Sequence, residues 1–158
     1  MADDHHESRV WIARPRDAVF AFFADPGNLA HITPGWLGLE MVGDAPAMAA
    51  GTVIDARIRW LGVPLRWRTF IREWDPPVRF VDVQIRGPYA RWEHRHLFLE
   101  DSGGTWVEDL VTYRLPFGPV GRLAHAVVVR RQLDAIWRYR ERRIGELVGP
   151  VRRSPPAG

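Results

Sequence analysis

Residues 87–116 read GPYARWEHRHLFLEDSGGTWVEDLVTYRLP, which is two strand-like runs joined by a glycine turn. Side chains along a strand point alternately to opposite faces of the sheet. On the first run this alternation gathers aromatic rings and imidazoles on one face: Trp92, His94, His96 and Phe98. On the second run it gathers a carboxylate and a phenol among aliphatic residues: Val107, Asp109, Val111, Tyr113 and Leu115. A covered face with this mixture of groups is typical of a ligand cavity rather than of a dry core.

The sequence on either side of this hairpin continues the strand pattern. Strand signals separated by connections that contain glycine or proline cover 8–13, 36–43, 51–60, 65–75, 78–86, 90–100 and 105–115. Short connections of this kind favour antiparallel neighbours. The pattern therefore predicts a meander of hairpins.

Helical signals precede and follow the later strands. Pro15 near the first helical position and Asp17 in the first turn predict a short helix that ends at 25–27, and a second short helix is expected over 28–32. After Pro116 the apolar residues recur mostly at helical spacing, which predicts one long amphipathic helix that ends at about Val148. Its arginines are expected to form a solvated face: Arg122, Arg130, Arg131, Arg138, Arg140, Arg142 and Arg143.

These elements predict an α+β fold. A seven-stranded, curved antiparallel sheet wraps around the long C-terminal helix, and two short helices follow the first strand. We expect residues 8–149 to form a single domain and residues 1–7 and 150–158 to be disordered tails.

The composition excludes several kinds of chemistry. The chain has no cysteine, and all 22 of its lysine and arginine positions are arginine. Disulfides, thiolate zinc sites and lysine Schiff bases are therefore excluded. The only serines are Ser8, Ser102 and Ser154, none of them placed where a scaffold would hold a nucleophile. Any catalysis falls to His, Asp, Glu, Tyr or Arg.

The charge and the hydropathy of the chain limit the kinds of partner that we expect it to bind. The formal net charge is only +3, and the arginines are interleaved with acidic residues, so we expect no nucleic-acid binding despite a pI near 10.1. No apolar run approaches the roughly 20 residues that span a bilayer, so we expect no integral membrane association. Residues 1–7 lack the apolar centre of a secretory signal, which favours a cytoplasmic protein.

The order of elements resembles the helix-grip fold of the START-like, Bet v 1-like (SRPBCC) superfamily. The run from Ile12 to Phe20 is similar to its strand-to-helix entry. Other positions resemble a bacterial ligand-binding subgroup: the Gly87-Pro88-Tyr89 turn, Trp92, His94, His96, Gly104, Thr105, Asp109, Tyr113 and Pro116. The resemblance covers about Arg9 to Ile144 and implies a deep apolar cavity between the sheet and the long helix. Lipid carriers and polyketide cyclases share this fold, so the fold alone does not choose a function.

Ten residues are candidates for the wall of this cavity: Trp67, Gln84, Tyr89, Trp92, His94, His96, Phe98, Asp109, Tyr113 and Trp137. The strand over 78–86 is ambiguous. Burying its aliphatic face would leave Asp82 and Gln84 in solvent, whereas the resemblance implies that they point inward. The tryptophans could either line the cavity or plug it. We assign no catalytic residue and no cofactor.

His94 and His96 have three interpretations. They form a structural polar cluster, they contact a ligand, or they bind a metal together with Asp109 as a two-His-one-carboxylate set. We interpret them as polar anchors and assign no metal. Asp109 and Tyr113 either make local hydrogen bonds, which we favour, or act as a base and a hydrogen-bond donor.

The leading hypothesis is a protein that binds a small hydrophobic molecule between the sheet and the C-terminal helix, for transport, sequestration or sensing. The alternative is an enzyme of the polyketide cyclase or dehydratase type that uses His, Asp and Tyr as acid/base groups. A third is a module that binds a protein or a membrane surface through the arginine-rich helix. The sequence leaves open whether the chain forms a homodimer.

Overall fold

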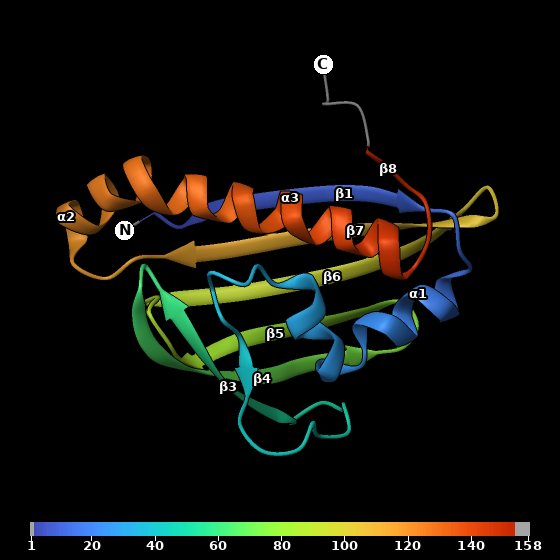
Figure 1. Cartoon of the computed structure of the whole chain (residues 1–158), viewed down its shortest axis with the longest axis horizontal. Helices are drawn as coiled ribbons and strands as arrows, with labels where there is room; N and C mark the ends of the chain where they lie inside the picture. The colour runs from blue at the N-terminus through green and yellow to red at the C-terminus, as the bar shows by residue number, and fades with distance from the viewer. Residues whose placement is uncertain (1, 154–158) are drawn as a thin grey trace.

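Eight strands form one antiparallel sheet in the computed structural model, which describes residues 2–153 (Figure 1). Their order across the sheet is β2-β3-β4-β5-β6-β7-β1-β8. The strands are β1 Asp4–Ile12, β2 Glu40–Met41, β3 Val53–Trp60, β4 Val63–Asp75, β5 Arg79–Arg86, β6 Arg91–Asp101, β7 Gly104–Arg114 and β8 Val151–Arg153. The first and last strands of the chain thus meet at one edge, where β8 pairs with Val10–Ile12 of β1.

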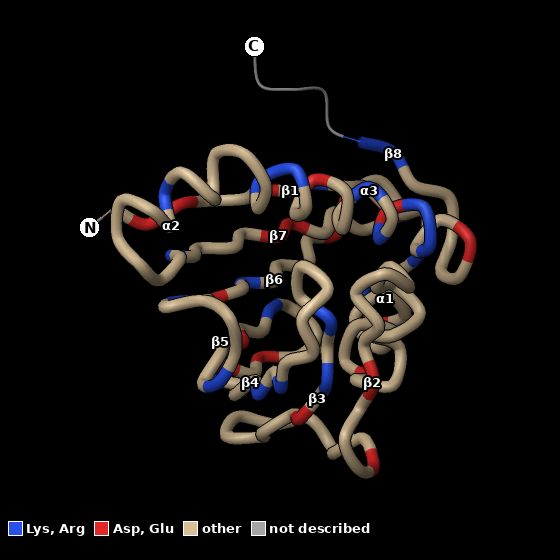
Figure 2. Tube along the Cα trace, turned by 60° about the vertical axis from the view of Figure 1, so that its left-hand side comes forward, with Lys and Arg blue, Asp and Glu red and all other residues tan. Residues whose placement is uncertain are grey.

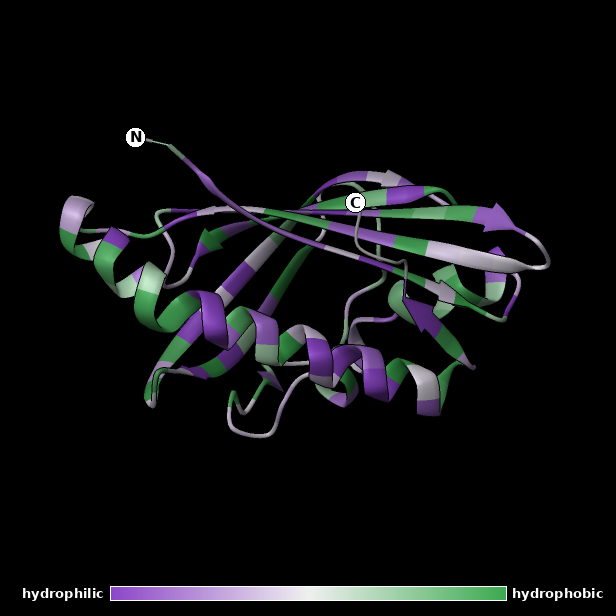
Figure 3. Ribbon diagram, turned by 90° about the horizontal axis from the view of Figure 1, so that it is seen from above, coloured by the Kyte–Doolittle hydropathy of each residue, from purple (hydrophilic) through white to green (hydrophobic). Residues whose placement is uncertain are grey.

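The helices lie on one face of this sheet (Figure 3). The short helix α1 covers Arg16–Phe23, and the 3₁₀ helix η1 covers Pro26–Ile32. The C-terminal helix begins as α2 Gly118–Ala124, passes through the π-helical turn η2 His125–Val129, and continues as α3 Arg130–Leu147. Four residues of α3 are buried: Leu133, Trp137, Arg140 and Ile144. Their spacing places them on one stripe of the helix, which faces the sheet.

Two tight turns fix the register of the meander. Trp60 pairs with Val63 and Asp101 with Gly104, so each turn has two central residues. Both central residues of each turn have positive φ, with 49° and 80° at Leu61 and Gly62 and 53° and 77° at Ser102 and Gly103. Turns with this left-handed backbone match the twist of antiparallel strands. The glycine turn of the opening sequence is therefore the β6–β7 hairpin.

The expected fold class is confirmed, with differences at the ends of the sheet. The sheet has eight strands rather than seven, and the strand expected over 36–43 is reduced to Glu40–Met41. Residues 4–7, expected in a tail, extend β1 because β7 is long enough to pair Asp4 with Tyr113. Residues 151–153, also expected in a tail, form β8, which covers the open edge of β1. Residues 1 and 154–158 of those tails lie outside the described residues.

The core has two apolar parts with a polar region between them. One part packs Phe80, Phe98 and Val107 with the residues of α1, and the other packs Trp92, Val111 and Tyr113 under the start of α3. Between them, on the same face of β6 and β7, lie three buried polar residues: His94, His96 and Asp109. Burying such groups costs free energy unless they are paired, so this region is where function is sought first.

The charged positions are distributed over the whole trace, and α3 carries acidic residues between its arginines (Figure 2). Arg143 pairs with Glu146, and Arg153 of β8 pairs with Glu141 at 2.6 Å. The expectation of a solvated arginine face is wrong for Arg140, whose side chain is buried against the sheet. Among the described residues, no helix is both long enough and apolar enough to cross a membrane.

Candidate functional site

A cavity of about 180 Å³ lies between the sheet, η1 and α3. The floor is apolar and comes largely from β3 and β4, with Ile54, Ala56, Ile58, Trp67 and Ile71. The helices close the opposite side with Leu29 and Ile32 of η1 and Leu133 and Trp137 of α3. Such a lining favours an apolar ligand, because each buried apolar group contributes free energy in proportion to the area removed from water.

One wall of the cavity carries charge. Asp82 of β5, His94 and His96 of β6, and Arg140 of α3 all line it. Asp82 lies opposite His94 in the β5–β6 ladder, and His96 lies opposite Asp109 in the β6–β7 ladder. Three neighbouring strands thus supply one polar cluster, which we define as Asp82, His94, His96 and Asp109. Asp109 lies behind the imidazoles and does not line the cavity.

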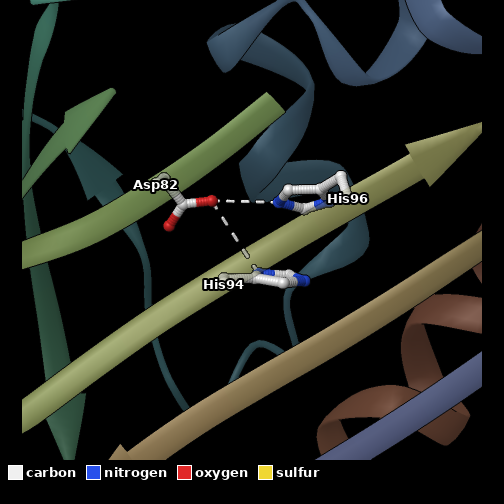
Figure 4. A group of neighbouring side chains, drawn as sticks. All are labelled: Asp82, His94 and His96. Carbon is white, nitrogen blue, oxygen red and sulfur yellow. Dashed lines mark hydrogen bonds and ion pairs between the residues drawn. The ribbon is translucent and has the colours of Figure 1, made fainter. Parts of the chain in front are cut away.

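The four side chains are linked by short contacts. Figure 4 shows three of these side chains, with Asp82 pointing toward His94 and His96. His94 Nε2 donates a hydrogen bond to Asp109 Oδ1 at 2.7 Å, and His96 Nε2 donates one to Asp82 Oδ2 at 2.9 Å. His96 Nδ1 is 3.0 Å from Asp109 Oδ1, an ion-pair distance without the alignment of a hydrogen bond. His94 Nδ1 is 3.9 Å from Asp82 Oδ2. Each imidazole therefore has one carboxylate on either side.

Burial and ion pairing shift the pKa values of the two carboxyl groups in opposite directions. Burial alone would raise the pKa of Asp82, but its hydrogen bond with His96 and the nearby positive charges lower it below the usual value. Burial opposes ionisation of Asp109 in the same way, yet the hydrogen bond from His94 and the close contact with His96 hold its pKa well below the usual range. Both carboxyl groups are therefore ionised at neutral pH.

The pKa values of the two imidazoles shift in opposite directions, although the rings lie only 3.7 Å apart between centres, at a tilt of 34°. Burial alone would lower the pKa of His96, but the nearby carboxylates of Asp109 and Asp82 raise it above the ordinary value. Burial and the charge of His96 lower the pKa of His94. The neutral form is therefore favoured more at His94 than at His96, and a neutral His94 that donates from Nε2 keeps a lone pair on Nδ1.

Arg140 brings a second positive charge to the wall. Its side chain is 8% exposed, and its guanidinium carbon lies 5.5 Å from the ring centre of Phe23 and 5.6 Å from that of Trp137. Its Nε has no hydrogen-bond partner among the described residues, and neither has the indole nitrogen of Trp137 or Trp60. Buried donors without partners are costly. The three residues that carry these donors all line the cavity.

Six of the ten candidate residues line the cavity: Trp67, Tyr89, Trp92, His94, His96 and Trp137. The tryptophans among them form part of its wall and also narrow it, since Trp67 and Trp92 pack edge to face at 5.2 Å between ring centres.

The other four candidates, Gln84, Phe98, Asp109 and Tyr113, do not line the cavity. The Gln84 side chain instead holds the β5–β6 connection, donating to the Tyr89 carbonyl oxygen at 2.8 Å. Phe98 packs on Phe20 at 5.1 Å between ring centres, in the apolar core. Asp109 binds the imidazoles from behind, and the Tyr113 hydroxyl is hydrogen-bonded to His125 Nε2 at 2.5 Å. Asp109 and Tyr113 thus have separate partners and do not form one acid/base pair.

Two residues of the wall were missed as site residues by the sequence analysis. Asp82 lies on a strand whose alternation is compatible with either orientation, so only the contact with His96 identifies it. Arg140 was placed with the solvated arginines. Its spacing from Leu133, Trp137 and Ile144 would have predicted that Arg140 is buried, because residues at this spacing form the buried stripe of the helix.

Comparisons with known proteins agree with this geometry. The family described as polyketide cyclase / dehydrase and lipid transport matches residues 12–138. TTHA0849 from Thermus thermophilus is 22% identical with a TM-score of 0.69, and the match covers 92% of this chain and 100% of that one. A START superfamily protein from Mycobacterium smegmatis is 10% identical with a TM-score of 0.69, covering 91% of this chain and 99% of that one.

Zhui aromatase/cyclase from Streptomyces sp. R1128 is also similar, with 18% identity, a TM-score of 0.64, and coverage of 93% of this chain and 99% of that one. At these identities the likeness to solved structures shows the fold alone. None of the curated proteins matches this chain in sequence.

Proposed function

Because the chain belongs to the polyketide cyclase / dehydrase and lipid transport family, within the START-like, Bet v 1-like superfamily, we propose that it binds a small hydrophobic molecule in the cavity between the sheet and α3. The observation that carries the proposal is an apolar cavity with one charged wall. Apolar side chains supply the affinity, and the few polar groups fix the orientation of the ligand.

The size and polarity of the cavity limit the ligand. Its volume of about 180 Å³ is below the roughly 300–1,000 Å³ of pockets that take drug-sized molecules, so we propose a compact ligand. The unpartnered N–H groups of Trp60, Trp137 and Arg140 favour a ligand that carries an oxygen acceptor. A small apolar ring system with a carbonyl or an anionic oxygen meets both conditions.

Filling the cavity tests the proposal. Ala56 is buried in the floor on β3, and Ala56→Phe places a ring in the cavity. The matched control is Ala135→Phe, the same change at an exposed position of α3. The probe is 2-naphthoate, a compact two-ring carboxylate that meets both conditions, and its binding is measured by calorimetry. Small molecules extracted from the purified wild-type protein are identified by mass spectrometry.

We expect the probe to bind the wild-type protein and the Ala135→Phe variant, and to bind the Ala56→Phe variant much more weakly. Circular dichroism confirms that each variant is folded, and Ile58→Phe replaces Ala56→Phe if the latter does not fold. Equal binding to all the folded variants, with no extractable ligand, would contradict the proposal.

A second candidate function is acid/base catalysis of the cyclase or dehydratase type. The specific observation is that the His96–Asp82 pair lines the cavity, within reach of a bound molecule. Asp109 and Tyr113, which the sequence analysis considered for these roles, have other partners. A catalyst would lose turnover in the His96→Gln variant while still binding the substrate, whereas a carrier would show no turnover in either form.

A third candidate, a module that binds a membrane surface, has an observation of its own. Four apolar side chains at the start of the C-terminal helix are exposed: Phe117 (81%), Val120 (72%), Leu123 (68%) and Val127 (54%). Residues 117–131 contain arginine at 122, 130 and 131 and neither aspartate nor glutamate. Apolar side chains beside positive charge favour an anionic bilayer surface.

A further inference from the structure

Asp109 holds both imidazoles of the polar cluster from the same side. Its Oδ1 lies 2.7 Å from His94 Nε2 and 3.0 Å from His96 Nδ1. The other nitrogen of each ring, His94 Nδ1 and His96 Nε2, therefore lies on the side of Asp82 Oδ2, at 3.9 Å and 2.9 Å (Figure 4). Two ring nitrogens and one carboxylate oxygen thus converge on one point of the cavity wall. A metal ion at this point replaces the proton that His96 Nε2 donates to Asp82, and the proton is released to solvent.

This arrangement is what a metal site of two histidines and one carboxylate requires. Histidines that bind a metal through one nitrogen almost always donate the other N–H to a carboxylate, a carbonyl or a water, which fixes the tautomer and the ring orientation. We propose that Asp82, His94 and His96 bind a divalent transition-metal ion, and that Asp109 is the positioning residue for both imidazoles. The inference concerns the ion alone and does not depend on which molecule the cavity takes.

The distances fit such an ion. Ligand atoms at about 2.0–2.1 Å from a tetrahedral zinc ion are about 3.3 Å from one another. The two separations from Asp82 Oδ2, 2.9 Å and 3.9 Å, lie on either side of that value. All three ligand atoms are within 4.8 Å of one another.

The surroundings hold the ligands in place. The ring of Phe80 stacks on His96 at 4.0 Å with an angle of 21°, and Trp137 packs against His94 at 5.6 Å between ring centres. The exposed fraction is 6% for the His94 side chain, 5% for His96 and 16% for Asp82. Because their rotamers are fixed by packing, the ligands lose little conformational entropy when an ion binds.

The set of ligands indicates which ions the site binds and what role the bound ion has. Two imidazoles with one carboxylate suit Zn²⁺ or Fe²⁺, whereas Mg²⁺ and Ca²⁺ prefer oxygen ligands. Three protein ligands leave a fourth position, which faces the cavity because Asp82, His94 and His96 all line it. Sites with an open position take water or a substrate as the fourth ligand.

The charges nearby favour an anionic fourth ligand. The side chain of Arg140 is buried and lines the same cavity wall as Asp82, His94 and His96. An anionic oxygen on the fourth position would therefore lie near both the ion and the guanidinium group. Metal and an anionic cavity ligand should therefore strengthen one another's binding.

The experiment is a calorimetric titration of the full chain with Zn²⁺ after removal of metals by chelator, with Co²⁺ as a spectroscopic probe. We expect one ion per chain and visible Co²⁺ absorption bands typical of imidazole ligands. Asp82→Asn, which preserves side-chain shape, and His94→Gln, which removes the imidazole but keeps a polar side chain, should both abolish saturable binding. Asp109→Asn should weaken binding by about 10- to 100-fold, the usual effect of losing an outer carboxylate.

Two exposed histidines outside the cluster, His5 and His31, provide matched controls. The His5→Gln and His31→Gln variants should bind Zn²⁺ as the wild-type protein does. Three outcomes would overturn the proposal: no saturable binding to the wild-type protein, unchanged binding to Asp82→Asn and His94→Gln, or loss of binding in either control. The organic probe is measured separately in the presence of chelator, so failure of this site and failure of the proposed ligand function are distinguishable.

Discussion

Replacing Asp109 by asparagine removes the negative charge that both imidazoles share. The Asp109 side chain is 5% exposed and has His94 Nε2 and His96 Nδ1 within 3.0 Å. Removing one partner of a buried ion pair typically costs about 3–5 kcal/mol, because the remaining charge stays buried without compensation. Asparagine still accepts a hydrogen bond through Oδ1, so we expect a loss near the lower limit, about 3 kcal/mol in the free energy of unfolding.

The neighbouring residue provides a matched control. Glu108→Gln removes the same charge one position earlier on β7, where Glu108 pairs with Arg9 at 2.7 Å and the two side chains are 35% and 46% exposed. Exposed pairs of this kind contribute about 0–1 kcal/mol. Urea unfolding at pH 7 in the presence of chelator measures both changes. If the two variants lose the same free energy within about 1 kcal/mol, the buried cluster does not stabilise the fold as argued.

Three further predictions concern pH, helix packing and the exposed helix. Burial lowers the pKa of His6, so the unfolded chain binds a proton at this residue at a higher pH than the folded chain does. The free energy of unfolding, measured with urea, should therefore fall as the pH drops below 6.5. The fall should be less steep in the His6→Gln variant. Gly121→Ala should destabilise by about 1–3 kcal/mol, because its Cβ would lie 2.0 Å from the Pro116 carbonyl oxygen, whereas Gly145→Ala should stabilise slightly; thermal unfolding measures both. If the helix binds anionic vesicles in co-sedimentation, Leu123→Glu should weaken that binding roughly tenfold or more, and equal binding to neutral vesicles would argue against the surface.

Much of the fold follows from local patterns in the sequence. The β6–β7 hairpin could be predicted because alternation and turn chemistry agree at Ser102 and Gly103. The start of β1 at Asp4 could not be predicted, because residues 4–7 are polar and become a strand only through their pairing with β7. Local propensity carries no information about such a partner.

Some residues of the candidate site could likewise be predicted from the sequence, and others could not. His94 and His96 were placed on the cavity face by the two-residue period of a strand. Gln84 shares a face with Asp82 by that period, but the β5–β6 ladder ends at Val83 and Glu93, and Gln84 then turns to the next connection. The place of Asp82 depends on its contact with His96 of another strand, which strand alternation does not show. Arg140 could have been recognised from its helical spacing.

The position of β1 has a consequence for the synthesis of the chain. The strand β1 pairs only with β7 and β8. Asp4 can pair only after Tyr113 has been made, and Ile12 can pair with β8 only after Val151 has been made. The β3–β7 meander leaves the ribosome with neighbouring strands in order, while β1, which is made before them, has no partner. Such long-range pairing slows folding and leaves strand edges open to other chains. Of the described strands, the one that is translated earliest is therefore among the last to be protected, and chaperone dependence is expected to concentrate there.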